Sequence, residues 1–367
     1  MPVGEQATTG DTRRVLHRRG AARFPLAAAL LVALASGCAT SWSLQQEPWD
    51  PRIQWPAAPA PARARLLMTI SGFRESGTSA RSLLLGGGGV PVIRPVAVAV
   101  GSDGRIAIAD TGCGCVHVYH PAEKRYEQIT AAGGETLRSP VGVAFDDDAR
   151  LYIADSALGR VFALDRSGAL LFRLERAGET PLQRPTGLAL DPARRVLYVA
   201  DTLAHTVNAF DTAGRLLFSF GGRGGEAGLF NFPTYLAWSE PGSLYVTDAL
   251  NFRVQQFDPG GKARATIGQH GDGSGDFSAP KGIAVDSGGV LYVADSLFDA
   301  VQLYDGHGQF LLTLGNRGTD PGEFWMPSGI FIDNHDRLFV CDTYNRRVQV
   351  FQLLSAEADA RSQGPLR

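Results

Sequence analysis

The residues best suited to chemistry in this chain are two cysteines and a histidine in one short stretch. Cys113, Cys115 and His117 offer two sulfur atoms and one imidazole, which are ligands that soft metal ions prefer. The stretch lacks the second cysteine pair of a zinc site, and its spacing differs from that of covalent haem attachment. A metal site, a disulfide and free thiols all stay open, with Cys341 as a further candidate partner.

An aspartate also recurs six times along the chain. Each one ends a short apolar run such as LYVAD, and successive aspartates are 45, 46, 47, 47 and 47 residues apart. Because a catalytic group is seldom needed six times, we expect these carboxylates to accept hydrogen bonds from the turn that follows each run. Arg160, Arg253 and Arg347 each follow an aspartate by five residues and are expected to form local ion pairs. The six aspartates are Asp110, Asp155, Asp201, Asp248, Asp295 and Asp342.

These aspartates mark a repeat that fills the chain from Arg94 to about Leu353. Each full repeat has four short runs rich in Val, Leu, Ile, Phe and Tyr, bounded by Gly, Asp, Ser and Pro, which is typical of strands. Units of this length cannot bury their apolar faces alone and must stack on their neighbours. Four strands per repeat, repeated radially, predict an all-β fold, a six-bladed β-propeller.

The sixth repeat lacks a fourth run, because polar residues follow Leu353. A suitable run lies before the first repeat, from Arg63 to Ile70, and it is similar to the fourth run of repeat five, Phe310 to Leu314. We therefore predict that this N-terminal strand completes the last blade. Closing the ring in this way would remove the open sheet edges.

Three further motifs recur in the repeats: Pro-x-Gly-Ile-Ala, Leu-Tyr-Val-Ala-Asp and Asn-x-Arg-Val-Gln-x-Phe. They are clearest at Asp248 to Phe257 and at Asp342 to Phe351. These motifs resemble NHL repeats, and the resemblance covers roughly 260 of 367 residues. It implies the propeller fold but no single function, because NHL propellers include RNA binders, protein scaffolds, sensor domains and a zinc-dependent lyase.

The first run of each repeat is expected to line the central channel. These six runs contain no His, Asp, Glu or Asn, which argues against a metalloenzyme with its metal on the axis. Two residues depart from the internal consensus. Tyr235 stands where four repeats have Gly and one has Ala, and Lys281 stands where the others have Val, Thr or Ser. We predict that both lie at the channel mouth, either as a recognition point or as structural filler.

The N-terminal residues resemble a bacterial export signal. Five arginines between positions 13 and 23 precede an apolar run, Phe24 to Ala35, that is too short to span a bilayer comfortably. The following Ala-Ser-Gly-Cys resembles a lipobox, which implies a lipoprotein signal peptide at 1–37 and lipidation of Cys38. Ala39 after the cysteine implies sorting to the outer membrane. Ordinary cleavage after Ala35, giving a periplasmic or secreted protein, is the alternative.

The remaining boundaries follow from composition. Residues 38–62 are rich in Pro and Ala and predict a tether; we expect residues 63–354 to form the propeller and residues 355–367 to form a flexible tail. This segment also contains three tryptophans, Trp42, Trp49 and Trp55, which is more aromatic residues than a simple spacer needs. We expect one or more of them to pack on the propeller rim, and contact with a partner or a membrane surface is the alternative.

The charge balance limits the possible partners. A formal net charge of -2 with 20% charged residues leaves no basic field that could hold nucleic acid. We predict a lipid-anchored binding or scaffold propeller of the bacterial cell envelope. Its loop face would recognise an envelope protein, a polysaccharide or a small molecule. The alternative is an envelope lyase or lactonase that uses loop residues with or without a metal ion, and no cofactor is predicted.

Overall fold

The computed structural model describes residues 41–48, 50, 52–76 and 88–354. The predicted signal peptide with Cys38, the residue Trp49 and the predicted tail at 355–367 lie outside the described residues. The described part contains one short 3-10 helix, Ala249–Asn251, and none of its helices is long and apolar enough to cross a membrane.

Five sheets of four antiparallel strands form the first five blades, with the inner strand first in each. Blade one holds β5 (Pro95–Val100), β6 (Ile106–Asp110), β7 (Cys115–His120) and β8 (Arg125–Ile129). Blade two holds β11 (Pro140–Phe145), β12 (Leu151–Asp155), β13 (Arg160–Leu164) and β14 (Leu170–Leu174). Blade three holds β17 (Pro185–Asp191), β18 (Val196–Asp201), β19 (Thr206–Asp211) and β20 (Leu216–Gly221). Blade four holds β21 (Pro233–Ser239), β22 (Ser243–Asp248), β23 (Arg253–Phe257) and β24 (Ala263–Ile267). Blade five holds β25 (Pro280–Val285), β26 (Leu291–Asp295), β27 (Ala300–Tyr304) and β28 (Phe310–Leu314).

The links after blades one and two carry small two-stranded sheets. One pairs β9 (Ala131–Ala132) with β10 (Glu135–Thr136), and the other pairs β15 (Arg176–Ala177) with β16 (Thr180–Pro181).

The N-terminal strand completes blade six, as the sequence predicts. This blade contains β29 (Pro327–Ile332), β30 (Arg337–Asp342), β31 (Arg347–Leu353) and β3 (Ala64–Ser76). β3 runs antiparallel to β31, with Ala64 opposite Leu353 and Ile70 opposite Val348. It continues past the predicted end at Ile70 to Ser76 and also pairs with β4 (Gly89–Pro91).

Part of the segment predicted as a tether forms strands instead. β1 (Ser41–Gln46) pairs with the second half of β3, and β2 (Gln54–Trp55) pairs with its first half, so the tether prediction over 38–62 fails for these residues. The physical reason is that β3 would otherwise be an exposed edge strand. Trp42 packs on Tyr126 at 4.9 Å between ring centroids and Trp55 on Phe351 at 5.6 Å, in agreement with the expected rim contacts.

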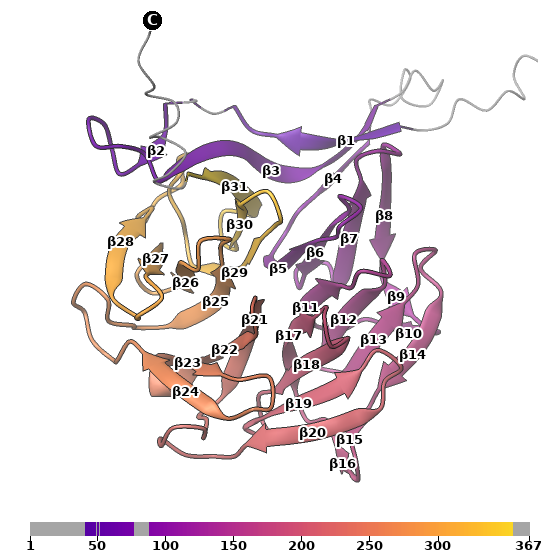
Figure 1. Cartoon of the computed structure of the whole chain (residues 1–367). Helices are drawn as coiled ribbons and strands as arrows, with labels where there is room; N and C mark the ends of the chain where they lie inside the picture. Colours follow the sequence, from indigo (N-terminus) through magenta and orange to yellow (C-terminus); the bar gives the residue numbers. More distant parts are fainter. Residues whose placement is uncertain (1–40, 49, 51, 77–87, 355–367) are drawn as a thin grey trace, which may run out of the picture. The chain divides into compact units, whose positions relative to one another are not determined.

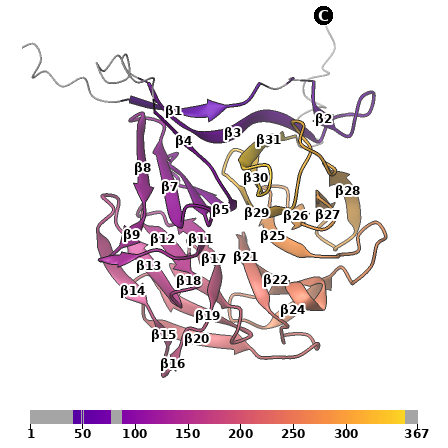
Figure 2. The same cartoon turned by 180° about the vertical axis from the view of Figure 1, so that it is seen from behind.

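The six inner strands form a closed ring. Each contacts the inner strands of both neighbouring blades, and β29 contacts β5 (Figures 1 and 2). Their backbones approach so closely that a Cβ on Gly142 would lie 2.1 Å from the Thr186 carbonyl oxygen, and one on Gly329 would lie 2.4 Å from that of Val96. Glycine is therefore required at these positions of the ring.

Candidate functional site

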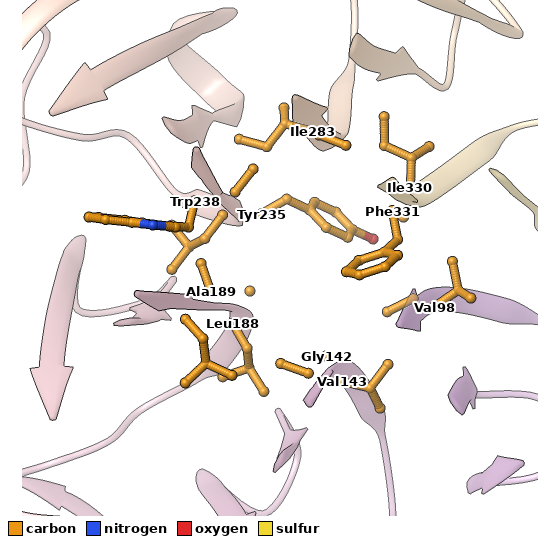
Figure 3. A pocket seen from close by; sticks show the side chains of 18 of the residues that line it. Val98, Gly142, Val143, Leu188, Ala189, Tyr235, Trp238, Ile283, Ile330 and Phe331 are labelled. Atoms are coloured by element: carbon orange, nitrogen blue, oxygen red, sulfur yellow. The ribbon is translucent and has the colours of Figure 1, made fainter. Parts of the chain in front are cut away.

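A cavity of about 300 Å³ lies on the axis of the ring. The inner strands of all six blades contribute to its wall (Figure 3). With the exception of Val141, the lining residues of the inner strands begin at the third or fourth residue of each strand, and in blades two, five and six they reach its last residue. The cavity therefore lies toward the C-terminal ends of the inner strands, and Pro192 of the β17–β18 hairpin marks its rim.

Nearly all side chains of the cavity wall are apolar. Leu188, Ile283 and Phe331 are among the side chains that face it (Figure 3). Among the described residues that line it, only Tyr235 and Trp238 carry polar side-chain atoms, and both have partners within the protein. The indole N–H of Trp238 donates to Glu240 Oε1 at 3.1 Å. Such a cavity can remove an apolar group from water, but it offers no general base and no set of metal ligands.

Tyr235 crosses the channel. Its hydroxyl, carried by β21 of blade four, donates to the Val96 carbonyl oxygen in blade one, on the far side of the ring, at 3.1 Å. Figure 3 shows its ring reaching across the axis toward Phe331. Burial raises the pKa of the Tyr235 phenol, so the group stays protonated at neutral pH and remains a donor. Tyr235 thus lies inside the channel as part of the cavity wall.

Lys281 is separate from this cavity. It is the second residue of β25, one position before the glycine that matches Tyr235, and it does not line the cavity. Burial lowers the pKa of its ammonium group, while Asp295 opposes that shift. The structure therefore does not assemble Tyr235 and Lys281 into one cavity site.

A second hollow of about 150 Å³ adjoins the cavity between blades two and three. Phe145, Leu190 and Pro192 line both spaces. Its wall adds four carboxylates and a guanidinium group, from Asp146, Asp147, Asp148, Asp191 and Arg195. The sequence analysis made no site prediction for this hollow, although three consecutive aspartates in one hairpin were a visible signal.

The repeated aspartates are buried structural acceptors. In blade one, Asp110 accepts hydrogen bonds from the backbone N–H groups of Ile93 and Arg94, at 2.6 and 2.8 Å. In blade five, Asp295 accepts them from Ser278 and Ala279, at 2.7 and 3.0 Å. The shared partner is thus the chain just before the inner strand. The expected turn after strand two also contributes in several blades, for example through Leu297 at 3.1 Å.

The arginines behave differently from one another. Arg253 and Arg347 bind the aspartates of their own blades, Asp248 at 2.8 Å and Asp342 at 2.7 Å. Arg160 instead binds Glu135 and also Glu175, the latter at 3.3 Å.

Cys113, Cys115 and His117 lie together in blade one. The two cysteines form a disulfide, whereas Cys341 is free and buried in blade six. The imidazole Nε2 of His117 lies 3.8 Å from the Cys113 Sγ and 3.7 Å from the Cys115 Sγ. Burial opposes ionisation of the neighbouring Asp110, but hydrogen bonds from His117 and three backbone N–H groups lower its pKa overall.

Comparisons with known proteins agree on the architecture. A family model described as a 6-bladed beta-propeller matches residues 286–360. None of the curated protein sequences compared with the chain matches it.

Several solved structures share the fold at low sequence identity. A gluconolactonase from Xanthomonas campestris has a TM-score of 0.55 and 18% identity, covering 84% of this chain and 100% of its own. Virginiamycin B lyase from Staphylococcus aureus, in a catalytically inactive form with quinupristin, has a TM-score of 0.54 and 10% identity over 72% of this chain and 96% of its own. A protein of unknown function from Bacteroides thetaiotaomicron has a TM-score of 0.56 and 15% identity, with coverage of 72% and 70%. Together with the ring of six sheets, these similarities show that the chain folds as a six-bladed β-propeller.

Proposed function

We propose that this protein is a non-catalytic, NHL-type binding propeller whose axial cavity takes a small apolar or amphipathic molecule. The apolar side chains of the cavity wall carry the proposal. A polysaccharide would need several polar side chains, whereas among the described lining residues only Tyr235 and Trp238 carry polar side-chain atoms, and a protein partner would contact the outer loops. The cavity volume of about 300 Å³ is at the lower end of the range for small-molecule sites.

A charge placed in the cavity should weaken this binding strongly. Phe331→Glu puts a carboxylate on the wall, and burying an ionised group without a partner is costly, so an apolar ligand should be rejected. The probe is the fluorescent dye 1-anilinonaphthalene-8-sulfonate, titrated into the folded protein. We expect saturable binding to the wild type and at least tenfold weaker binding to the variant.

The matched control is Leu217→Glu, which makes the same chemical change on the outer strand β20. The Leu217 side chain is 50% exposed, so its replacement should leave dye binding unchanged. If both variants lost dye binding equally, the net charge of the protein would be the cause. If both kept dye binding equally, the dye would bind outside the cavity. Either result would contradict the proposal.

We further propose that the propeller is held in the bacterial envelope by a lipid on Cys38. The support is the lipobox-like sequence that precedes this residue. Cys38→Ala should prevent lipid attachment and move the protein from the membrane fraction to the soluble fraction. A mature wild-type protein that begins at Ser36 by mass spectrometry would instead support ordinary cleavage.

An envelope lyase or lactonase is the second candidate. It is favoured by the carboxylates of the hollow that adjoins the cavity, and the lyase and gluconolactonase neighbours support it at the level of fold alone. Stoichiometric zinc or calcium in the purified protein, lost on Asp147→Asn, would favour this candidate over simple binding.

A further inference from the structure

Blades four and six share a side-chain cluster around their aspartate, which we call the aspartate clamp. In blade six, Asn345, Arg347 and Gln349 donate to Asp342 Oδ2 at 2.9, 2.7 and 3.1 Å. In blade four, Asn251, Arg253 and Gln255 donate to Asp248 Oδ2 at 2.7, 2.8 and 3.2 Å. Each clamp thus uses three residues at alternate positions along the turn and the third strand.

Blade one replaces all three clamp residues at once. Strand register establishes the equivalence, because Cys115 pairs with Asp110 as Arg253 pairs with Asp248 and Arg347 with Asp342. Cys113, Cys115 and His117 therefore occupy the Asn, Arg and Gln positions. His117 keeps the contact with the aspartate, at 3.3 Å from Nε2 to Asp110 Oδ2. Hydrogen bonding to the aspartate accounts for the Asn, Arg and Gln residues of blades four and six. It does not account for two cysteines and a histidine at the same positions of blade one.

The three replacements have the geometry of metal ligands. Their ligand atoms all lie within 4.8 Å of one another, and Nε2 is nearly equidistant from the two sulfurs at 3.7 and 3.8 Å. Metal–sulfur and metal–nitrogen bonds of about 2.3 and 2.0 Å at trigonal or tetrahedral angles place the nitrogen about 3.5–3.7 Å from each sulfur and the two sulfurs about 3.8–4.0 Å apart. The nitrogen is thus already positioned, and only the two sulfurs must separate from their bonded distance.

The surroundings hold the imidazole and shield the site. The Tyr126 hydroxyl lies 2.8 Å from His117 Nδ1, so the second ring nitrogen has the partner that metal-binding histidines usually have. Phe73 stacks on His117 and on Tyr126, at 5.3 and 4.4 Å between centroids. Gln128 Nε2 donates to Cys115 Sγ at 3.2 Å, which would offset negative charge on a thiolate. Cys115 and His117 are fully buried, whereas Cys113 is half-buried and gives a route of approach.

We propose that blade one contains a redox-controlled site for Cu(I), with Cys113, Cys115 and His117 as its ligands. Two thiolates and one imidazole suit this soft ion, which accepts three ligands. A dithiol reductant passes two electrons and two protons to the Cys113–Cys115 disulfide and becomes a disulfide itself. Cu(I) then displaces the two thiol protons into solvent and binds both sulfurs. Binding through Nε2 ends its hydrogen bond to Asp110: the ring proton moves from Nε2 to Nδ1, where it faces the Tyr126 oxygen, and Nε2 binds the ion with its lone pair. A disulfide oxidant takes the two electrons, with two protons from solvent, and becomes a dithiol, so that the Cys113–Cys115 bond re-forms, both thiolates are lost and the ion is released.

The test is a competition for Cu(I) between the protein and a chromophoric Cu(I) chelator, bathocuproine disulfonate, without oxygen. We expect the reduced wild type to take one more equivalent of Cu(I) than the disulfide form does. His117→Gln introduces the residue that the clamps carry, so it should fold normally and bind Cu(I) roughly 10- to 100-fold more weakly.

A triple variant separates this site from the other cysteines. Cys113→Asn with Cys115→Arg and His117→Gln installs the complete clamp in blade one, while Cys38 and Cys341 are unchanged. It should melt at least as high as the reduced wild type and should lack the extra equivalent. Equal Cu(I) uptake by the reduced wild type and the triple variant would overturn the proposal, as would equal uptake by the oxidised and reduced wild type.

Discussion

A chain that begins at Gly86 should lose cooperative unfolding and aggregate. The deletion removes β3, the outermost of the four strands that blade six needs, and exposes the edge of β31. It also removes Leu66, Ile70 and Phe73, which are at most 1% exposed and whose burial contributes about 1.5–3 kcal/mol each. The measurement is thermal unfolding followed by circular dichroism, together with light scattering. A melting curve like that of the full chain would show that β3 does not close the ring.

Two point substitutions test the same closure without shortening the chain. Ile70→Asp puts a carboxylate at a fully buried position of β3 and should lower the free energy of unfolding by more than about 4 kcal/mol. Arg65→Asp places the same carboxylate at an exposed position of the same strand and should cost less than about 1 kcal/mol. Similar costs for the two variants would argue against the burial of β3.

The second large effect is expected at a repeated aspartate. Asp295→Ala removes the acceptor of four backbone N–H groups, those of Ser278, Ala279, Leu297 and Phe298. An unsatisfied buried donor costs about 1–3 kcal/mol, so we expect a loss of about 3–5 kcal/mol in the free energy of unfolding. Urea-induced unfolding measures this loss.

Asp305→Ala is the matched control in the same blade. Asp305 accepts hydrogen bonds from His307 and Gln309 in an exposed turn, at 2.9 Å each, where water can replace it. We expect this variant to lose less than about 1 kcal/mol. If Asp295→Ala costs no more than Asp305→Ala, the repeated aspartates have a role other than holding the blades.

The sequence predicts the blades and their closure because both depend on local signals that recur. Each LYVAD run ends at the aspartate that pairs with the proline of the inner strand, as Asp295 does with Pro280. The strand β3 was found because a repeat lacked its fourth run. β1 was missed because its residues, Ser41–Gln46, are mostly polar and only half-buried, so they lack the apolar alternation that indicates a strand.

The cavity could not be predicted because its wall comes from six segments spread over more than two hundred positions. The sequence predicts that the first run of each repeat lines the channel, but among single residues only the departure of Tyr235 from the internal consensus marks the cavity wall. Lys281 departs from the consensus too and does not line the cavity. The hydrogen bond between Ser278 and Asp295 joins residues that are 17 positions apart, whereas the sequence rules for turns cover only about four consecutive residues. The equivalence of Cys113 and Cys115 to the clamp residues could not be predicted either, because it is established by the pairing register of the strands.

The most direct test of the account is to identify what the cavity holds when the protein is made in a bacterial envelope. Wild type and Phe331→Glu are purified in parallel, denatured in organic solvent, and the extracts are compared by mass spectrometry. The account predicts a small apolar or amphipathic molecule near one per wild-type chain that is depleted from the variant. Identical extracts, with the two proteins equally folded, would contradict the claim that the axial cavity is the binding site.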